Sequence, residues 1–361
     1  MAKIITVYDT SRQRFILADM AYIRWLKISE SLAKLGHQVD IATNEFMGCR
    51  ENEQVSMTRR LRRISLSEAR WKDYDVIKTL FHAGFDALEK CGGANHPFII
   101  SKLGSVVGPR DMKGVYFYGK RRKELCSIQK RIDKTSKFIT VISKPAKDLW
   151  EDCLGVKDNI LVVPGAVDSV IPPETFNPYP RGSGLKCVFF GNVYSENSQP
   201  EAHRVVIDKL NKLGKLLKLY DIQLYMAGVG DVSRLDKKYV NCLGIVSYER
   251  TWNYFYHANA GIVVIAGSFQ HNNESSKIYH YLRAGLPVVS EKGFPNDNVV
   301  EESKLGYVVE NGNLELMAKK ISEAVYKKDW DRQYAIRYIL NNHTWDKRVK
   351  VYSEIISKNF G

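Results

Sequence analysis

The stretch that decides the fold is NNESSKIYHYLRAGLPVVS, residues 272–290. Ser275 and Ser276 are residue types that begin helices, because their hydroxyl groups can cap the first turn. Apolar residues then recur at helical spacing along one face, at Ile278, Tyr281 and Leu282. Gly285 and Pro287 end the pattern and lead into an apolar run. The stretch therefore predicts a helix that begins near residue 275, followed by a buried strand.

Lys277 lies in the first turn of this predicted helix, and Glu274 precedes the cap. The N-terminus of a helix has unpaired amide N–H groups and roughly half a positive charge. A lysine beside such groups makes a site suited to a diphosphate. The same residues also fit an ordinary exposed helix start with a solvated lysine, and their spacing alone does not separate the two interpretations.

The whole chain alternates apolar strand segments with segments of helical period, which is typical of parallel sheets covered on both faces. Its 361 residues exceed the size of a single core, so we expect about two domains. A helix is predicted from Ala21 to Leu35. The strands predicted in the first half are 3–9, 38–43, 75–82, 97–103, 137–143 and 159–165. The fold class is therefore α/β.

Composition excludes several classes of protein. Hydrophobic residues make up 44% of the chain, which is ample for packed cores and argues against disorder. The six cysteines include no C-x-x-C pair, so neither a zinc site nor a disulfide framework is predicted, and we expect reduced thiols in the cytoplasm. The first residues, MAKIITVYD, predict a strand rather than a signal peptide. No apolar run approaches the ~20 residues needed to cross a bilayer.

The net charge of +14 predicts a partner rich in negative charge. The densest basic cluster extends from Tyr116 to Lys137, where aromatic residues precede a cationic segment. Its cations are Lys120, Arg121, Arg122, Lys123, Lys130, Arg131, Lys134 and Lys137. Such a segment suits docking on an anionic membrane, although a solvated helix face has the same composition. Nucleic acid is an unlikely partner, because no nucleic-acid-binding motif accompanies the charge.

The run SKIYHYLRAGLPVVS resembles the donor-binding segment of GT-B glycosyltransferases, especially those of family four. Other segments resemble that family in the same order along the chain. They are CVFFGNV (187–193), IQLYMAGVGD (222–231), NCLGIVSYERTWNYFYHANAGIVVI (241–265) and LGYVVENGNLELMAKKI (305–321). The resemblance covers most of residues 185–350 and is more specific than any single glycine motif.

The resemblance implies a GT-B architecture, in which two Rossmann-like doubly wound domains face a cleft. We expect an acceptor-binding domain at 1–175, a donor-binding domain at 176–340 and a terminal helix at 341–361 that crosses back to the first domain. The proline-rich and glycine-rich segment 170–184 is the predicted linker.

The resemblance also implies a donor site for a UDP- or GDP-linked sugar, with no other cofactor. Its implied residues are Gly191, Asn192, Gly228, Ile245, Ser275, Ser276, Lys277 and His280. Three positions depart from the family pattern. Asn192 stands where a second cation is usual, so Arg12 or Arg14 is a candidate replacement. Asn272 and His280 stand where the family has glutamates, so we expect His280 to bind the ribose and Glu274 to contact the sugar.

Catalytic roles are predicted for Lys277, Glu274, His82 and Asp19. Lys277 would neutralise the leaving diphosphate, and His82 is similar to a histidine that faces the donor sugar in related enzymes. Asp19 or Asp9 would serve as a general base if the reaction inverted the anomeric centre. No metal site is predicted, because neither Asp-x-Asp sequence, at 73–75 or at 329–331, follows a buried strand as a metal site requires.

The sequence therefore predicts a metal-independent glycosyltransferase of the retaining type. It would move a sugar from a nucleotide diphosphate to a glycan or a lipid-linked glycan. It would act in the cytoplasm, with peripheral binding to the inner face of the plasma membrane as a further expectation. Two alternatives remain open: an epimerase of nucleotide sugars with the same fold, and a non-catalytic protein that binds nucleotide sugars or carbohydrate.

Overall fold

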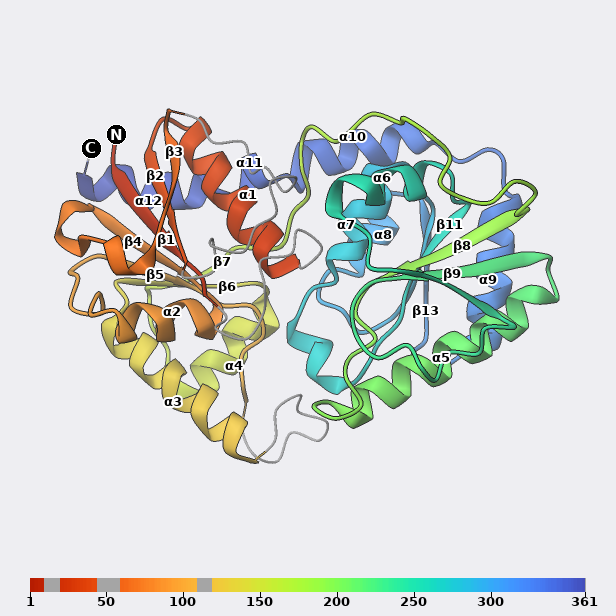
Figure 1. Ribbon diagram of the computed structural model, residues 1–361, viewed down its shortest axis with the longest axis horizontal. Helices are drawn as coiled ribbons and strands as arrows, with labels where there is room; N and C mark the ends of the chain where they lie inside the picture. Colours follow the sequence, from red (N-terminus) through yellow and green to blue (C-terminus); the bar gives the residue numbers. More distant parts are fainter. Residues whose placement is uncertain (10–19, 44–58, 109–118, 361) are drawn as a thin grey trace. The chain divides into compact units, whose positions relative to one another are not determined.

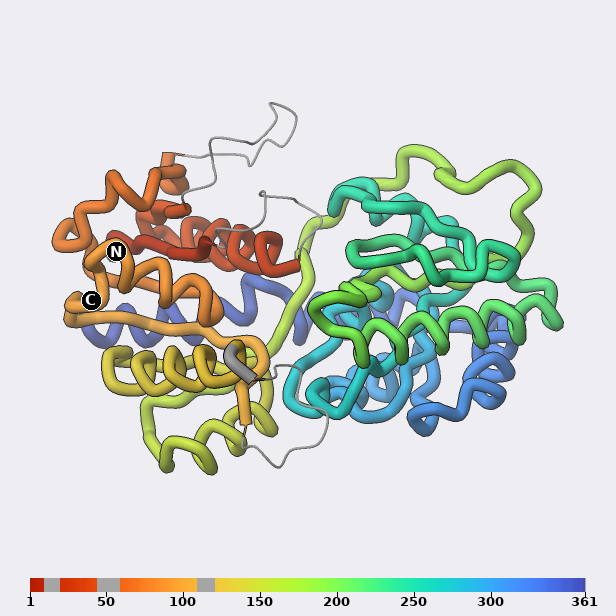
Figure 2. The backbone as a smooth tube through the Cα atoms, turned by 60° about the horizontal axis from the view of Figure 1, so that its bottom comes forward, coloured from red at the N-terminus to blue at the C-terminus, as the bar shows by residue number. Residues whose placement is uncertain are grey.

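A computed structural model describes residues 1–9, 20–43, 59–108 and 119–360 (Figure 1). These residues form two compact units. The first holds the described residues up to Pro164 and those from Trp345 onward, and the second runs from Gly165 to Thr344. Each unit is a parallel sheet with helices on both faces (Figures 1 and 2), so the prediction of an α/β fold with two Rossmann-like domains is confirmed.

The first unit has a seven-stranded parallel sheet in the order β3-β2-β1-β4-β5-β6-β7. Its strands are β1 (Lys3–Val7), β2 (Gln38–Ala42), β3 (Leu61–Ile64), β4 (Val76–Leu80), β5 (Ile99–Lys102), β6 (Phe138–Val141) and β7 (Ile160–Val162). The strand order reverses between β1 and β4, so the chain leaves these two strands toward opposite sides. Their carboxyl ends form the topological switch point, where α/β folds place ligands.

In the described part of the first unit, helices cover both faces of the sheet (Figure 1). One face carries α1 (Met20–Lys34), α11 (Trp345–Arg348) and α12 (Lys350–Phe360), and the other carries α2 (Phe81–Lys90), α3 (Gly119–Thr135) and α4 (Lys144–Leu154). Two 3-10 turns, Leu66–Glu68 and Trp71–Asp73, precede β4. The last helix is tied to the sheet by a 3.1 Å hydrogen bond between Tyr352 and Thr140.

The second unit has a six-stranded parallel sheet in the order β10-β9-β8-β11-β12-β13. Its strands are β8 (Leu185–Phe190), β9 (Ile222–Ala227), β10 (Val240–Gly244), β11 (Ala260–Val263), β12 (Val288–Glu291) and β13 (Gly306–Val309). The helices are α5 (Pro200–Lys218), α6 (Tyr248–Tyr256), α7 (Ser276–Arg283), α8 (Asn298–Glu302), α9 (Leu314–Tyr326) and α10 (Arg332–Asn342), with a 3-10 turn at Ser268–Asn272. The switch point lies between β8 and β11.

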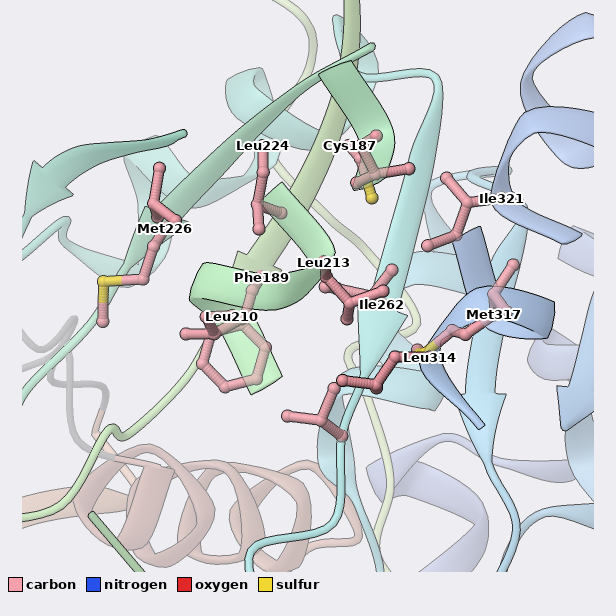
Figure 3. Packing of buried hydrophobic residues seen from close by; sticks show 14 of the residues in the cluster. Cys187, Phe189, Leu210, Leu213, Leu224, Met226, Ile262, Leu314, Met317 and Ile321 are labelled. Carbon is pink, nitrogen blue, oxygen red and sulfur yellow. The ribbon is translucent and has the colours of Figure 1, made fainter. Parts of the chain in front are cut away.

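The main core of the second unit lies between its sheet and helices α5 and α9 (Figure 3). Apolar residues of α5 recur at helical spacing and are buried, at Val206, Leu210, Leu213 and Leu217. They pack against Cys187, Leu224 and Ile262 of the sheet and against Met317 of α9. This core fixes β8, whose carboxyl end leads directly into the glycine turn at Gly191.

The predicted helix near residue 275 is α7, and Gly285 ends it with a φ of +70°. Strand β3 was not predicted, because its sequence LRRI has neither a continuous apolar run nor a clean alternation. Its Arg62 forms two hydrogen bonds, of 2.9 and 2.8 Å, with the buried Asp40. The segment 170–184 packs against α6, where Asn253 Oδ1 accepts a 2.9 Å hydrogen bond from the backbone N–H of Thr175.

Candidate active site

The first turn of α7 receives no side-chain cap from the serine that occupies its cap position. Ser275 makes no side-chain hydrogen bond to the first turn. Its side chain is buried, and its Oγ has no hydrogen-bond partner among the described residues. The N–H groups of Ser276 and Lys277 therefore receive no cap from Ser275, and a buried hydroxyl beside them is also unsatisfied. Such an arrangement is suited to an anionic ligand.

Lys277 crosses the glycine turn that follows β8. A Cβ atom on Gly191 would lie 2.3 Å from Cε of Lys277 and 2.8 Å from its Nζ, so the end of the lysine side chain occupies the space that any larger residue at 191 would need. Gly228, at the end of β9, packs against the same turn, because a Cβ there would lie 1.9 Å from the carbonyl oxygen of Gly191. Three of the predicted site residues therefore meet at the carboxyl ends of neighbouring strands.

The ammonium group of Lys277 has no ion pair or hydrogen bond among the described residues, and besides the Gly191 turn it lies over the ring of Phe189, with the centroid 5.1 Å away. Burial lowers the pKa of Lys277 from its ordinary value of 10.5 to about 8. The amine is still mostly protonated at pH 7. It is thus a partly desolvated cation for which the described residues provide no counterion.

Glu274 and His280 are engaged within the protein. Glu274 Oε2 accepts a 2.5 Å hydrogen bond from the backbone N–H of Gly165. His280 is buried, with Nδ1 2.7 Å from the carbonyl oxygen of Ser276 and Nε2 3.2 Å from the hydroxyl of Tyr248. Since the carbonyl oxygen only accepts, Nδ1 of His280 carries a hydrogen. Both ring nitrogens are therefore hydrogen-bonded within the protein, one to the first turn of α7 and the other to Tyr248 of α6. The ribose role of His280 stays a prediction.

The other predicted donor residues lie in turns around Gly191 or beside α7. Asn192 is exposed, and its Oδ1 accepts a 2.6 Å hydrogen bond from the backbone N–H of Tyr194, which stabilises the turn. Ile245 follows β10 and is 60% exposed, so its side chain is available to a ligand. Asn272 is buried. Arg12, Arg14 and Asp19 lie outside the described residues.

In the first unit, His82 lies in the first turn of α2 rather than at the end of a strand, because β4 ends at Leu80 and the helix begins at Phe81. His82 Nε2 lies 3.1 Å from Oε1 of Gln129, whose amide is oriented by two hydrogen bonds to Val107. Nε2 therefore donates, and Nδ1 has the lone pair. Burial lowers the pKa of His82 to about 4, so it is neutral near pH 7.

The carboxylates considered for other roles have structural partners. Asp9, which follows the carboxyl end of β1, is buried, and its Oδ1 accepts a 3.0 Å hydrogen bond from the hydroxyl group of Thr43. Asp75 accepts the backbone N–H of Lys3 at 2.7 Å, and Asp331 caps α10. Within the described ranges, no three His, Cys, Asp or Glu side chains are grouped so that they could hold a metal ion.

The fold is similar to that of solved glycosyltransferases. Sucrose-phosphate synthase from Thermosynechococcus elongatus is 12% identical, with a TM-score of 0.68 over 100% of this chain and 99% of that one. HepE from Anabaena, solved with UDP and glucose, is 11% identical, with a TM-score of 0.69 over 99% and 100% of the two chains. WaaG, a glycosyltransferase involved in lipopolysaccharide biosynthesis, is 12% identical, with a TM-score of 0.63 over 99% and 100%.

At these identities the likeness establishes the GT-B fold, and a family match adds the class of activity. The chain is a glycosyltransferase with the GT-B fold. Residues 206–351, which include α7, match the family described as Glucosyltransferase 3-like, C-terminal domain. No curated protein sequence matches the chain.

Sequence reasoning selected Gly191, Gly228 and Lys277, which the structure brings together, but did not select Asn296. This residue follows β12 by five positions and contacts the main chain of Ser275. Its only signal in the sequence is that it lies in GFPND, a turn-rich run after a buried strand. Such a run predicts a loop, and nothing in it indicates which side chain reaches α7.

Proposed function

We propose that this glycosyltransferase takes its sugar from a nucleotide diphosphate, with UDP-glucose as the first donor to test. The acceptor would be a hydroxyl group of a glycan or of a lipid-linked glycan. The family described as Glucosyltransferase 3-like supports glucose as the sugar, and the UDP bound by the structurally similar HepE supports the nucleotide. The observation that carries the proposal is the cation of Lys277, which has no ion-pair partner in the described part of the chain and lies beside a helix start that Ser275 does not cap.

A diphosphate would satisfy the groups that this site leaves unsatisfied. A partly buried cation without a counterion is unfavourable, because its desolvation is not offset by an ion pair. A diphosphate would supply the counterion to Lys277 and would accept hydrogen bonds from the N–H groups of the first turn and from Ser275 Oγ. The glycines at 191 and 228 would let it approach the backbone closely.

The proposed reaction exchanges one glycosidic bond for another. The bond between the anomeric carbon and the diphosphate oxygen breaks, and the acceptor oxygen bonds to that carbon. The acceptor proton moves to an oxygen of the departing diphosphate, so retention of configuration needs no side-chain base. Lys277 would stabilise the negative charge that develops on the leaving group, a role that makes a metal ion unnecessary. His82 would accept a hydrogen bond from a sugar hydroxyl through Nδ1.

A lipid-linked acceptor would be reached through the basic cluster, for which α3 supplies most of the described part. The arginines of this helix are engaged, Arg121 with Glu124, Arg131 with Glu89, and Arg122 with the carbonyl oxygen of Gly108. Lys123, Lys130 and Lys134 are exposed and have no ion-pair partner among the described residues. They recur at helical spacing, so we propose that this lysine face binds anionic headgroups. Tyr116, Phe117 and Tyr118 lie outside the described residues, and no described helix is long and apolar enough to cross a bilayer.

The proposal is tested by incubating the protein with labelled UDP-glucose and a panel of soluble and lipid-linked glycans. We expect label to appear on an acceptor in the anomeric configuration of the donor, with release of UDP that depends on the acceptor. Interconversion of donor sugars without an acceptor would instead indicate an epimerase. Failure to bind any nucleotide diphosphate or nucleotide sugar would contradict the proposal.

A further inference from the structure

The loop after β12 holds the residue that precedes α7. Asn296 is 2% exposed, and its carboxamide makes two hydrogen bonds to the main chain of Ser275. Oδ1 of Asn296 accepts the Ser275 N–H at 3.0 Å, and Nδ2 donates to the Ser275 carbonyl oxygen at 3.0 Å. A single buried side chain thus bonds to both polar groups of one backbone residue, whose carbonyl oxygen also accepts a 3.3 Å hydrogen bond from the N–H of Ile278.

The loop that carries Asn296 is itself braced. Asp297 Oδ2 accepts the backbone N–H groups of Gly293 and Phe294 at 2.6 and 2.9 Å. Oδ1 of the same carboxylate accepts a 3.2 Å hydrogen bond from Ser290 Oγ at the end of β12. Because these hydrogen bonds hold the loop in one conformation, the backbone that carries the Asn296 side chain is also held in place.

The two bonds set the direction of the first free amide of α7. The carbonyl group of Ser275 and the N–H of Ser276 belong to one planar trans peptide and point in opposite directions. When Asn296 Nδ2 draws the carbonyl toward the β12 loop, the N–H of Ser276 must point away from that loop. The other bond fixes the preceding peptide plane, so the backbone on both sides of the Ser275 Cα atom is oriented.

We propose that Asn296 is a positioning residue of the donor site, which aims the uncapped amide of Ser276 and the hydroxyl of Ser275 at the donor diphosphate. This inference rests on the proposed function, because the ligand is the same. Asn296 touches neither donor nor acceptor and acts through Ser275. N–H and O–H groups that are already oriented need no rearrangement when the ligand binds. Losing this orientation therefore lowers the affinity for the ligand without removing any contact with it.

The first test compares UDP binding to the wild-type protein and to Asn296→Ala by isothermal titration calorimetry. We expect the dissociation constant for UDP to rise roughly ten- to hundredfold, the scale on which misplacement of binding groups acts. Asn253→Ala is the matched control. Asn253 is similarly buried, at 4% exposed, and its carboxamide also bonds to backbone N–H groups, but at Thr175 and Phe176 in the segment packed on α6. It should lower thermal stability without changing the affinity for UDP.

The second test uses Asn296→Asp, which keeps the size of the side chain. The ionised carboxylate still accepts the Ser275 N–H but cannot donate to its carbonyl oxygen, and it places a negative charge near the diphosphate. A protonated carboxyl group regains the donor. We therefore expect the affinity of the Asp variant for UDP to recover relative to the Ala variant as the pH falls. Relief of charge repulsion alone would bring the Asp variant only up to the affinity of the Ala variant, so we expect the protonated Asp variant to bind UDP more tightly than the Ala variant at low pH. The Asp variant also serves if the Ala variant does not fold.

The outcomes separate this inference from the function on which it rests. If wild-type protein binds no nucleoside diphosphate, the proposed function and the inference both fail. If wild-type protein binds UDP and Asn296→Ala binds it equally well, the inference fails and the function stands. The inference also fails if the Asp variant does not bind UDP more tightly than the Ala variant at low pH, because the donated hydrogen bond then contributes nothing.

Discussion

Replacing Lys277 with methionine should make the ligand-free protein more stable and the enzyme nearly inactive. Burial lowers the pKa of this lysine from 10.5 to about 8. Since one pKa unit corresponds to about 1.4 kcal/mol, a pKa lowered from 10.5 to about 8 means that the folded protein loses about 3 kcal/mol in keeping the amine charged. Methionine has a similar length and no charge, so the free energy of unfolding at pH 7 should rise by up to about 3 kcal/mol. Sugar transfer should fall at least ~100-fold, because one preorganised electrostatic group is lost.

The pH dependence follows from the sign of the shift. Below pH 8 the amine of Lys277 is charged in both the folded and the unfolded protein, so the whole penalty is present. Between pH 8 and 10.5 the unfolded state binds more protons, and wild-type stability therefore rises toward that of the methionine variant. Over the same interval the neutral amine no longer attracts a diphosphate. We expect kcat/KM to decline above about pH 8 in the wild type, and Lys277→Arg, which stays charged, to lack this decline.

The assays are urea denaturation without ligand and initial rates of transfer across pH. Lys319→Met is a matched control, since Lys319 is exposed on α9 and has no ion-pair partner among the described residues. It should change neither stability nor rate. Wild-type activity in Lys277→Met would refute the site, and a large loss of stability in that variant would refute the argument from burial.

Four further results are expected. Transfer should survive excess EDTA, and complete loss that magnesium or manganese restores would show that a metal is required. Wild-type protein should co-sediment with anionic vesicles at low salt but not with neutral ones. Substitution of Lys123, Lys130 and Lys134 with alanine should reduce this binding more than substitution of the exposed lysines Lys215, Lys237 and Lys238; equal effects would refute the lysine face. Lys78→Met should raise the melting temperature. Lys78 is 3% exposed, burial lowers its pKa to about 7, and its ammonium group lies over the ring of Tyr352. A lower melting temperature would contradict this reasoning.

The elements with a strong apolar period could be predicted from the sequence, and those held by tertiary contacts could not. Helix α7 was predicted from its cap residues and its apolar face, and β1 from a continuous apolar run. Strand β3 was missed because it is stabilised through Arg62 and Asp40, a pairing between residues on neighbouring strands. The predicted strand at 75–82 was too long, since the turn into α2 is made by Phe81 at a φ of +56°, which side-chain type does not indicate.

The candidate site shows the same division. Gly191, Gly228 and Lys277 could be selected because the family resemblance fixed their order, and the structure places them together. The engagement of His280 with Tyr248 could not be foreseen, because it depends on how α6 packs against α7. Asn296 was missed for a related reason. A carboxamide that positions another residue has no motif, and only its two bonds to Ser275 reveal it.

The most direct test of the central claim is a crystal structure of the protein with UDP. The diphosphate should lie at the start of α7, within hydrogen-bonding distance of the N–H groups of Ser276 and Lys277, with Lys277 Nζ paired to a phosphate oxygen beside Gly191. A nucleotide bound elsewhere on the second unit, with Lys277 still unpaired, would contradict the assignment of this helix as the donor diphosphate site.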